Sequence, residues 1–151
     1  MSERRSKIVS ILAHPMVSVV VSLLGINLAI DDALDYSYAP DFVWKSLISG
    51  AAVAIPMLIF MRQDLIKNKN LHVRAAAREL SGEDLHEHRS RQFRLGIVLV
   101  LGFALIILIS SLWQIPSRAG LGMPMILAVA LYPQQKAIYE AAKARLEETV
   151  E

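Results

Sequence analysis

The sequence contains no cysteine, and four long stretches of it contain no Asp, Glu, Lys or Arg. Without cysteine the chain has no disulfide, no cysteine-ligated zinc and no thiol nucleophile, and the redox compartment stays undecided. The charge-free stretches are residues 8–30, 46–61, 95–117 and 119–135, so all 16 basic and 14 acidic residues lie outside them. Charge is therefore segregated along the chain.

The charge-free stretches are apolar on every side. A helix at the surface of a soluble protein carries a charged face, so these stretches exclude an ordinary soluble domain, a disordered chain and a nucleic-acid-binding module. Roughly 20 apolar residues span the ~30 Å hydrocarbon core of a bilayer. We predict an all-α, polytopic membrane protein. Its membrane domain, residues 1–135, has four transmembrane helices at about 8–30, 42–61, 95–114 and 119–135.

The fourth stretch is the least regular, because it contains Pro124 and is bounded by Pro116 and Pro133. From Ala119 to Tyr132 it is short for a span, and only when extended to Gln135 does it reach a feasible length. We favour a span over a re-entrant or interfacial segment.

Residues 62–94 form a long polar segment of helical composition, in which Ser81 and Gly82 mark a stop and a restart. Ser81 is placed to cap the second helix, with Asp84 three residues on. The two arms are expected to form a helical hairpin at the membrane surface. The tail, residues 136–151, is predicted to be an amphipathic helix. Its four-residue spacing places one set of side chains on one face: Ile138, Ala142, Leu146 and Val150.

Basic residues are distributed unevenly between the expected loops. The N-terminus, the 62–94 segment and the tail together carry every Lys and Arg except Lys45 and Arg118. Because Lys and Arg are retained on the cytoplasmic side, we predict that both termini and the 62–94 segment are cytoplasmic. The mixed charge of that segment favours this topological role over binding to anionic headgroups or to an acidic partner.

Three histidines lie in the polar segment: His72, His86 and His88. His86 and His88 are two residues apart, so on a helix they point to different faces and do not chelate one ion. Glu83 and His86 have the Glu-x-x-His spacing of di-iron bundles, but such sites need two of these motifs. We predict a solvated helix surface here and no metal site.

The remaining polar candidates favour structural roles. His14 is the ionisable side chain within the first apolar stretch, and near its start a neutral imidazole can hydrogen-bond to another helix. Gly120 and Gly122 indicate close helix packing rather than ligand binding. The sequence has no nucleophile motif and no phosphate loop. We therefore assign no catalytic, cofactor-binding or metal-binding residue.

Several short motifs resemble the N-terminal half of bacterial PAP2-related membrane proteins, relatives of the lipid-phosphate phosphatases. They are residues 11–15 (Ile-Leu-Ala-His-Pro), 54–56 (Ala-Ile-Pro), 84–86 (Asp-Leu-His) and 91–94 (Arg-Gln-Phe-Arg). The resemblance covers about residues 7–132. It implies a helical membrane fold and, in complete members of the family, hydrolysis of lipid phosphates.

The chain departs from the catalytic pattern of that family. Lys67 and Arg74 have the Lys-x6-Arg spacing of the first motif, but Ala75 replaces its proline. Residues 116–119 lack the histidine of the second motif, and no histidine follows His88. Without the nucleophilic histidine, phosphoryl transfer through it cannot proceed.

The sequence thus predicts a small integral-membrane accessory or scaffold protein without catalytic activity of its own. The spans contain few polar groups of the kind that line an ion or solute path. Expected partners are the bilayer and other membrane subunits or further copies of the chain, with no nucleic acid and no cofactor. The alternative is a truncated or degenerate PAP2-like lipid-phosphate phosphatase relative.

Overall fold

The computed structural model describes residues 14–35 and 40–148, and all regular structure within these ranges is helical. This confirms the predicted all-α class. In chain order the elements are α2 (Met16–Leu34), α3 (Pro40–Lys67), α4 (Lys69–Ala76), α5 (Gly82–Trp113), α6 (Ser117–Leu127), the 3-10 helix η1 (Ala128–Leu131) and α7 (Tyr132–Glu148).

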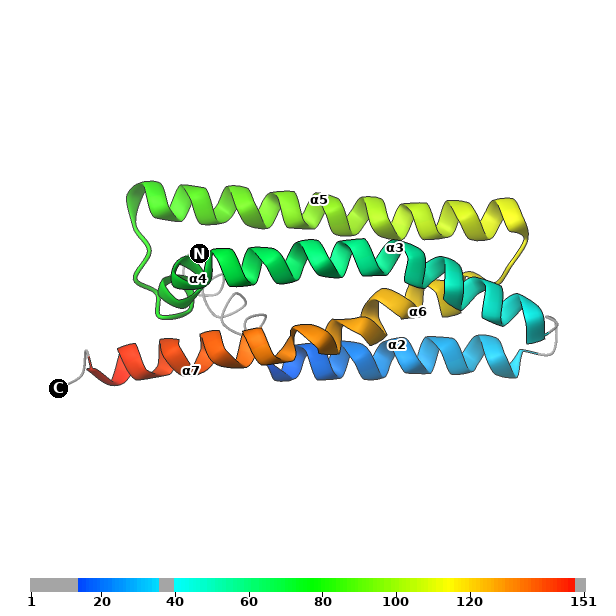
Figure 1. Ribbon diagram of the computed structural model, residues 1–151, viewed down its shortest axis with the longest axis horizontal. Helices are drawn as coiled ribbons and strands as arrows, with labels where there is room; N and C mark the ends of the chain where they lie inside the picture. Colours follow the sequence, from blue (N-terminus) through cyan, green and yellow to red (C-terminus); the bar gives the residue numbers. More distant parts are fainter. Residues whose placement is uncertain (1–13, 36–39, 149–151) are drawn as a thin grey trace, which may run out of the picture.

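The helices form an elongated bundle in which the long elements alternate in direction (Figure 1). α3 and α5 run antiparallel to each other, and α2 lies along the opposite side of the bundle. α6 returns between α2 and α3 and also contacts α5, so it occupies the centre of the bundle. Through η1 the chain continues from α6 into α7.

Within residues 14–35 and 40–148, three helices are long and apolar enough to cross a membrane: α2, α3 from Asp41 onward, and α5. These helices fit a membrane protein. The expected fourth span at 119–135 is not one continuous helix. α6 has only 11 residues, the chain then tightens into η1, and α7 begins at Tyr132. Pro124 inside α6 and Pro133 at the start of α7 each lack a backbone N–H, which limits continuous α-helical hydrogen bonding.

The other predicted boundaries shift by a few residues. α2 begins directly after Pro15 and continues through Asp31 and Asp32, past the predicted end of the first span at residue 30. α3 passes the predicted end of its span at Met61 and reaches Lys67. Residues 8–13, the start of the first predicted span, lie outside the described residues. α5 is a single helix from Gly82 to Trp113, so the polar segment continues at Arg94 into the third predicted span without a break.

Glycines allow α6 to lie against its neighbours. A Cβ atom added to Gly25 would stand 2.5 Å from the carbonyl oxygen of Gly122, and one added to Gly122 would stand 2.5 Å from that of Gly25. Gly50 meets the backbone of Gly120 in the same way. Backbone contact of this kind is typical of membrane helices that pack through small residues. The predicted packing role of Gly120 and Gly122 is confirmed.

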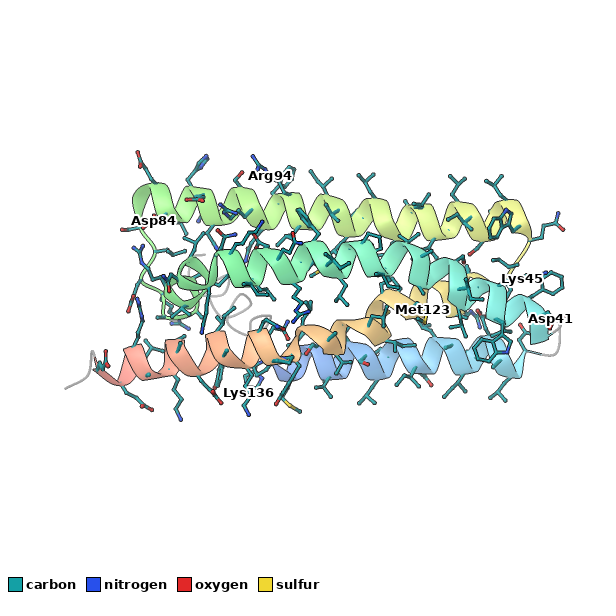
Figure 2. The ribbon with its side chains drawn as sticks, viewed as in Figure 1. Asp41, Lys45, Asp84, Arg94, Met123 and Lys136 are labelled. Carbon is teal, nitrogen blue, oxygen red and sulfur yellow. The ribbon has the colours of Figure 1, made fainter. Side chains whose placement is uncertain are left out.

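Polar side chains concentrate at the ends of the bundle. Of the residues labelled in Figure 2, Asp84, Arg94 and Lys136 lie toward one end and Asp41 and Lys45 at the other. Met123, on α6, lies between the helices in the middle.

We call residues 62–94 together with α7 the polar head. Its core is small and apolar: Val73 and Ala77 pack against Ile138 and Ala142 of α7. Leu146, on the same predicted face of the tail, is 47% exposed. Val150 lies outside the described residues.

Two ion pairs connect different segments of the polar head. Arg74 of α4 pairs with Asp84 of α5 at 2.7 Å, and Arg145 of α7 pairs with Glu79 at 3.0 Å. Ser81 is the N-cap residue of α5, as predicted, but its side chain makes no capping hydrogen bond. Asp84 forms an ion pair with Arg74. The spacing of residues around Ser81 does not predict this contact.

Candidate functional site

A polar cluster joins α3, α4 and α5 inside the head, and Asp64 is its centre. Asp64 is held mostly buried, with its side chain 12% exposed. Its Oδ2 lies 2.9 Å from His72 Nε2, and its Oδ1 accepts a hydrogen bond of 2.8 Å from Asn68 Nδ2. Asp64, Asn68 and His72 follow one another at four-residue intervals, which keeps them on one side of the helical path despite the break at Asn68.

α5 contributes Arg91 to this cluster. Its Nη1 lies 3.4 Å from Asp64 Oδ1, while its Nε and Nη2 donate to Glu87 Oε1 at 3.0 and 2.7 Å. The hydrogen bonds to Glu87 raise the pKa of Arg91, with a smaller contribution from Asp64. Arg91 thus links α5 to α3 through the same carboxylate that holds His72.

His88 lies beside the cluster without a hydrogen bond. It is 6% exposed, and neither ring nitrogen has a partner among the described residues. Its ring meets the ring of His72 edge to face, with centroids 5.6 Å apart. Burial lowers the pKa of His88, nearby His72 lowers it further, and Asp64 opposes the shift. His88 is therefore neutral at neutral pH.

The predicted solvated surface is right for His86, which is exposed, and wrong for His88. The two residues point to different faces of α5, as their spacing requires, and α4 covers one of those faces. Within residues 14–35 and 40–148, no group of three His, Asp or Glu side chains is placed to hold a metal ion.

The geometry of the cluster favours joining helices over chemistry. Both carboxylate oxygens of Asp64 are engaged, and Asp64 fixes the orientation of His72 as a second group would fix a general base. Among the described residues, no Ser, Thr or Tyr lines the small cavity that adjoins Asp64 between α3 and α5.

A second buried polar arrangement holds the N-terminus of α6. The first N–H groups of a helix have no acceptor within that helix. Asp32 of α2 is 3% exposed, and its Oδ2 accepts a hydrogen bond of 2.6 Å from the backbone N–H of Ala119. Ser46 Oγ of α3 accepts the N–H of Gly120 at 2.8 Å and donates to the carbonyl of Pro116. α2 and α3 thereby cap α6 together.

His14 has the structural role that the sequence favours, although it lies just before α2 rather than inside a span. Its Nδ1 accepts a hydrogen bond of 3.2 Å from the N–H of Met16, at the start of α2. Its ring packs edge to face on Tyr139 of α7, with centroids 4.8 Å apart. His14 therefore couples the start of α2 to the polar head.

Lys67 and Arg74, whose spacing matches the first motif of the resembled family, make different contacts. Arg74 is paired with Asp84, while Lys67 lines the cavity between α3 and α5, which Arg74 does not reach. Ser117 begins α6. A comparison with known protein families, curated proteins and solved structures found no match for this chain.

Proposed function

We propose that this chain is a small integral-membrane accessory or scaffold protein that presents its polar head on one side of the membrane. The observation that carries the proposal is the use of the head's polar groups. Asp64 binds both His72 and Arg91, which joins three helices. Two further ion pairs tie α4 to α5, and α7 to the loop between α4 and α5. Side chains that are engaged in such contacts stabilise the arrangement of the helices rather than activate a substrate.

The membrane bundle supports the same proposal. Its buried serines mostly bond to backbone carbonyls: Ser18 to Pro15, Ser22 to Ile126, and Ser49 to Ser46. Such bonds join or steady helices. A path for ions or solutes needs polar side chains that face a water-filled passage.

We further propose four crossings, with α6 and η1 providing the fourth. α4 and α7 pack against each other, so the chain must return to the head after α5. Together α6 and η1 advance roughly 25 Å at standard helical rises, and the first turn of α7 supplies the rest of the ~30 Å core. The excess of Lys and Arg on the head's side supports a cytoplasmic location for that side.

Purification of the full chain from its native membranes in mild detergent tests the accessory role. We expect a membrane protein, or a second copy of the chain, to co-purify at a fixed ratio determined by quantitative mass spectrometry. Ile138→Asp places a charge in the α4–α7 contact and should abolish this association. Leu108→Ala, on the exposed side of α5, is the control and should retain it.

Two results would contradict the proposal. One is recovery of the wild-type chain alone as a monomer, and the other is equal recovery of the partner with Ile138→Asp. A third measurement addresses the alternative function. Steady release of inorganic phosphate from phosphatidic acid by the purified chain, lost in Lys67→Gln, would support the phosphatase relative instead.

A further inference from the structure

A cavity of about 240 Å³ lies between α3 and α5, where the apolar bundle gives way to the polar head. Two lining residues locate the cavity relative to the ends of the apolar stretches. Phe60 is next to the last residue of the charge-free stretch 46–61, and Leu95 is the first residue of the stretch 95–117. The cavity therefore lies at the level where hydrocarbon meets headgroups in a membrane that these helices span.

The polar lining of the cavity is predominantly cationic. Lys67, Arg91 and Arg94 contribute to it, and Asp64 is its one acidic residue. Asp64 is already bonded to His72, Asn68 and Arg91. Within the described part of the chain, Lys67 and Arg94 have no ion-pair partner. Two exposed cations are thus left uncompensated beside a recess.

We propose that this cavity binds the phosphate of an anionic phospholipid headgroup. Lys67 and Arg94 supply the attraction for the phosphate, and the amide of Gln63, which also lines the cavity, supplies hydrogen-bonding capacity. Phe60 and Leu95 provide an apolar wall on the membrane side for the first part of the acyl chains. Basic pockets between membrane helices are a known form of lipid headgroup site.

The bound lipid is a resident rather than a substrate. Among the described residues, none that lines the cavity carries a hydroxyl, thiol or imidazole that would attack a phosphate. Inorganic phosphate carries the same anionic chemistry, but it gains nothing from the apolar wall formed by Phe60 and Leu95. The position of the cavity at the membrane boundary therefore favours a lipid over the free ion.

The test measures lipid retention by the purified full chain. Phosphatidylglycerol, phosphatidylcholine with the same acyl chains, and inorganic phosphate are each titrated onto the protein in mild detergent, with bound molecules counted by native mass spectrometry. The cavity variant is Lys67→Gln with Arg94→Gln. The matched control is Arg62→Gln with Lys69→Gln. Arg62 and Lys69 are exposed basic residues of the same polar head, and neither lines the cavity.

We expect the wild type to prefer phosphatidylglycerol to phosphatidylcholine. The cavity variant should bind phosphatidylglycerol roughly 30-fold more weakly, since each basic residue near an anionic lipid contributes about a fivefold change in affinity. The control pair should change the affinity by less than about threefold. Far-UV circular dichroism and gel filtration establish that both variants keep the helical fold.

Three outcomes would overturn the proposal. An equal loss in the two variants would mean attraction to the whole basic surface rather than to the cavity. Equal retention of the two lipids by the wild type would mean that the headgroup charge is not read, and this comparison needs no variant to fold. Displacement of the lipid by an equal concentration of inorganic phosphate would assign the cavity to the free ion.

Discussion

Removal of the Asp32 carboxylate should loosen α6, the helix at the centre of the bundle. In Asp32→Ala the backbone N–H of Ala119 loses its only acceptor from α2 while remaining buried. The matched control is Asp31→Ala. It removes the same charge from the neighbouring position on α2, where the side chain is exposed.

The magnitude follows from the type of bond. A hydrogen bond to a charged acceptor contributes about 1.5–3 kcal/mol, and the N–H left behind belongs to a fully buried residue. A carboxylate at a helix N-terminus adds about 0.3–1 kcal/mol through the helix dipole. We therefore expect Asp32→Ala to lower the free energy of unfolding by about 2–4 kcal/mol, and Asp31→Ala by less than about 0.5 kcal/mol.

Thermal unfolding in detergent, followed by far-UV circular dichroism, measures the difference. For a chain of this length, 1 kcal/mol corresponds to roughly 2–4 °C, so Asp32→Ala should lower the Tm by roughly 4–16 °C. Ser46→Ala removes the acceptor of the next amide, that of Gly120, and should act in the same direction. Equal Tm values for Asp32→Ala and Asp31→Ala would refute the capping of α6 by α2.

Three further predictions concern packing and pH. Gly50→Ala should destabilise the bundle by about 1–3 kcal/mol, because its Cβ atom would overlap the backbone of Gly120, whereas Gly96→Ala meets nothing within 4 Å and should be neutral or stabilising. Thermal unfolding of the two variants distinguishes them, and equal losses would contradict the close contact. Because burial lowers the pKa of His88, the unfolded chain binds more protons than the folded chain at mildly acidic pH. The unfolding free energy should therefore fall as the pH drops from about 7 through the ordinary histidine pKa of about 6.5. His88→Phe should flatten this fall and cost little stability at pH 7.5, since His88 gives up no hydrogen bond among the described residues. Parallel stability curves for the wild type and His88→Phe would count against a buried neutral imidazole.

Much of the fold follows from the distribution of charge along the chain. The uninterrupted apolar stretches at 46–61 and 95–117 predict α3 and α5, because a helix is the only single-segment structure that satisfies its own backbone in lipid. The packing role of Gly120 and Gly122 is also readable, since small residues in apolar helices allow backbones to touch. These signals are local in sequence.

The contacts that define the two polar arrangements are not local. Ala119 meets Asp32 across 87 positions, and Arg91 meets Asp64 across 27. Asp32 reads as a loop residue because it follows the apolar stretch, yet α2 continues and buries it. The burial of His88 likewise depends on α4 folding back over α5. Such pairings depend on the tertiary arrangement, so local patterns in a single sequence do not predict them.

We propose that the bundle holds the polar head on the cytoplasmic side of a membrane. Because the chain has no cysteine, single cysteines at Asp31, Glu83 and Glu148 report the two ends of the bundle without background labelling. All three positions are exposed. A membrane-impermeant maleimide should label position 31 in intact cells, and positions 83 and 148 only after permeabilisation. Labelling of position 148 in intact cells while 83 stays protected would contradict the return of the chain through α6.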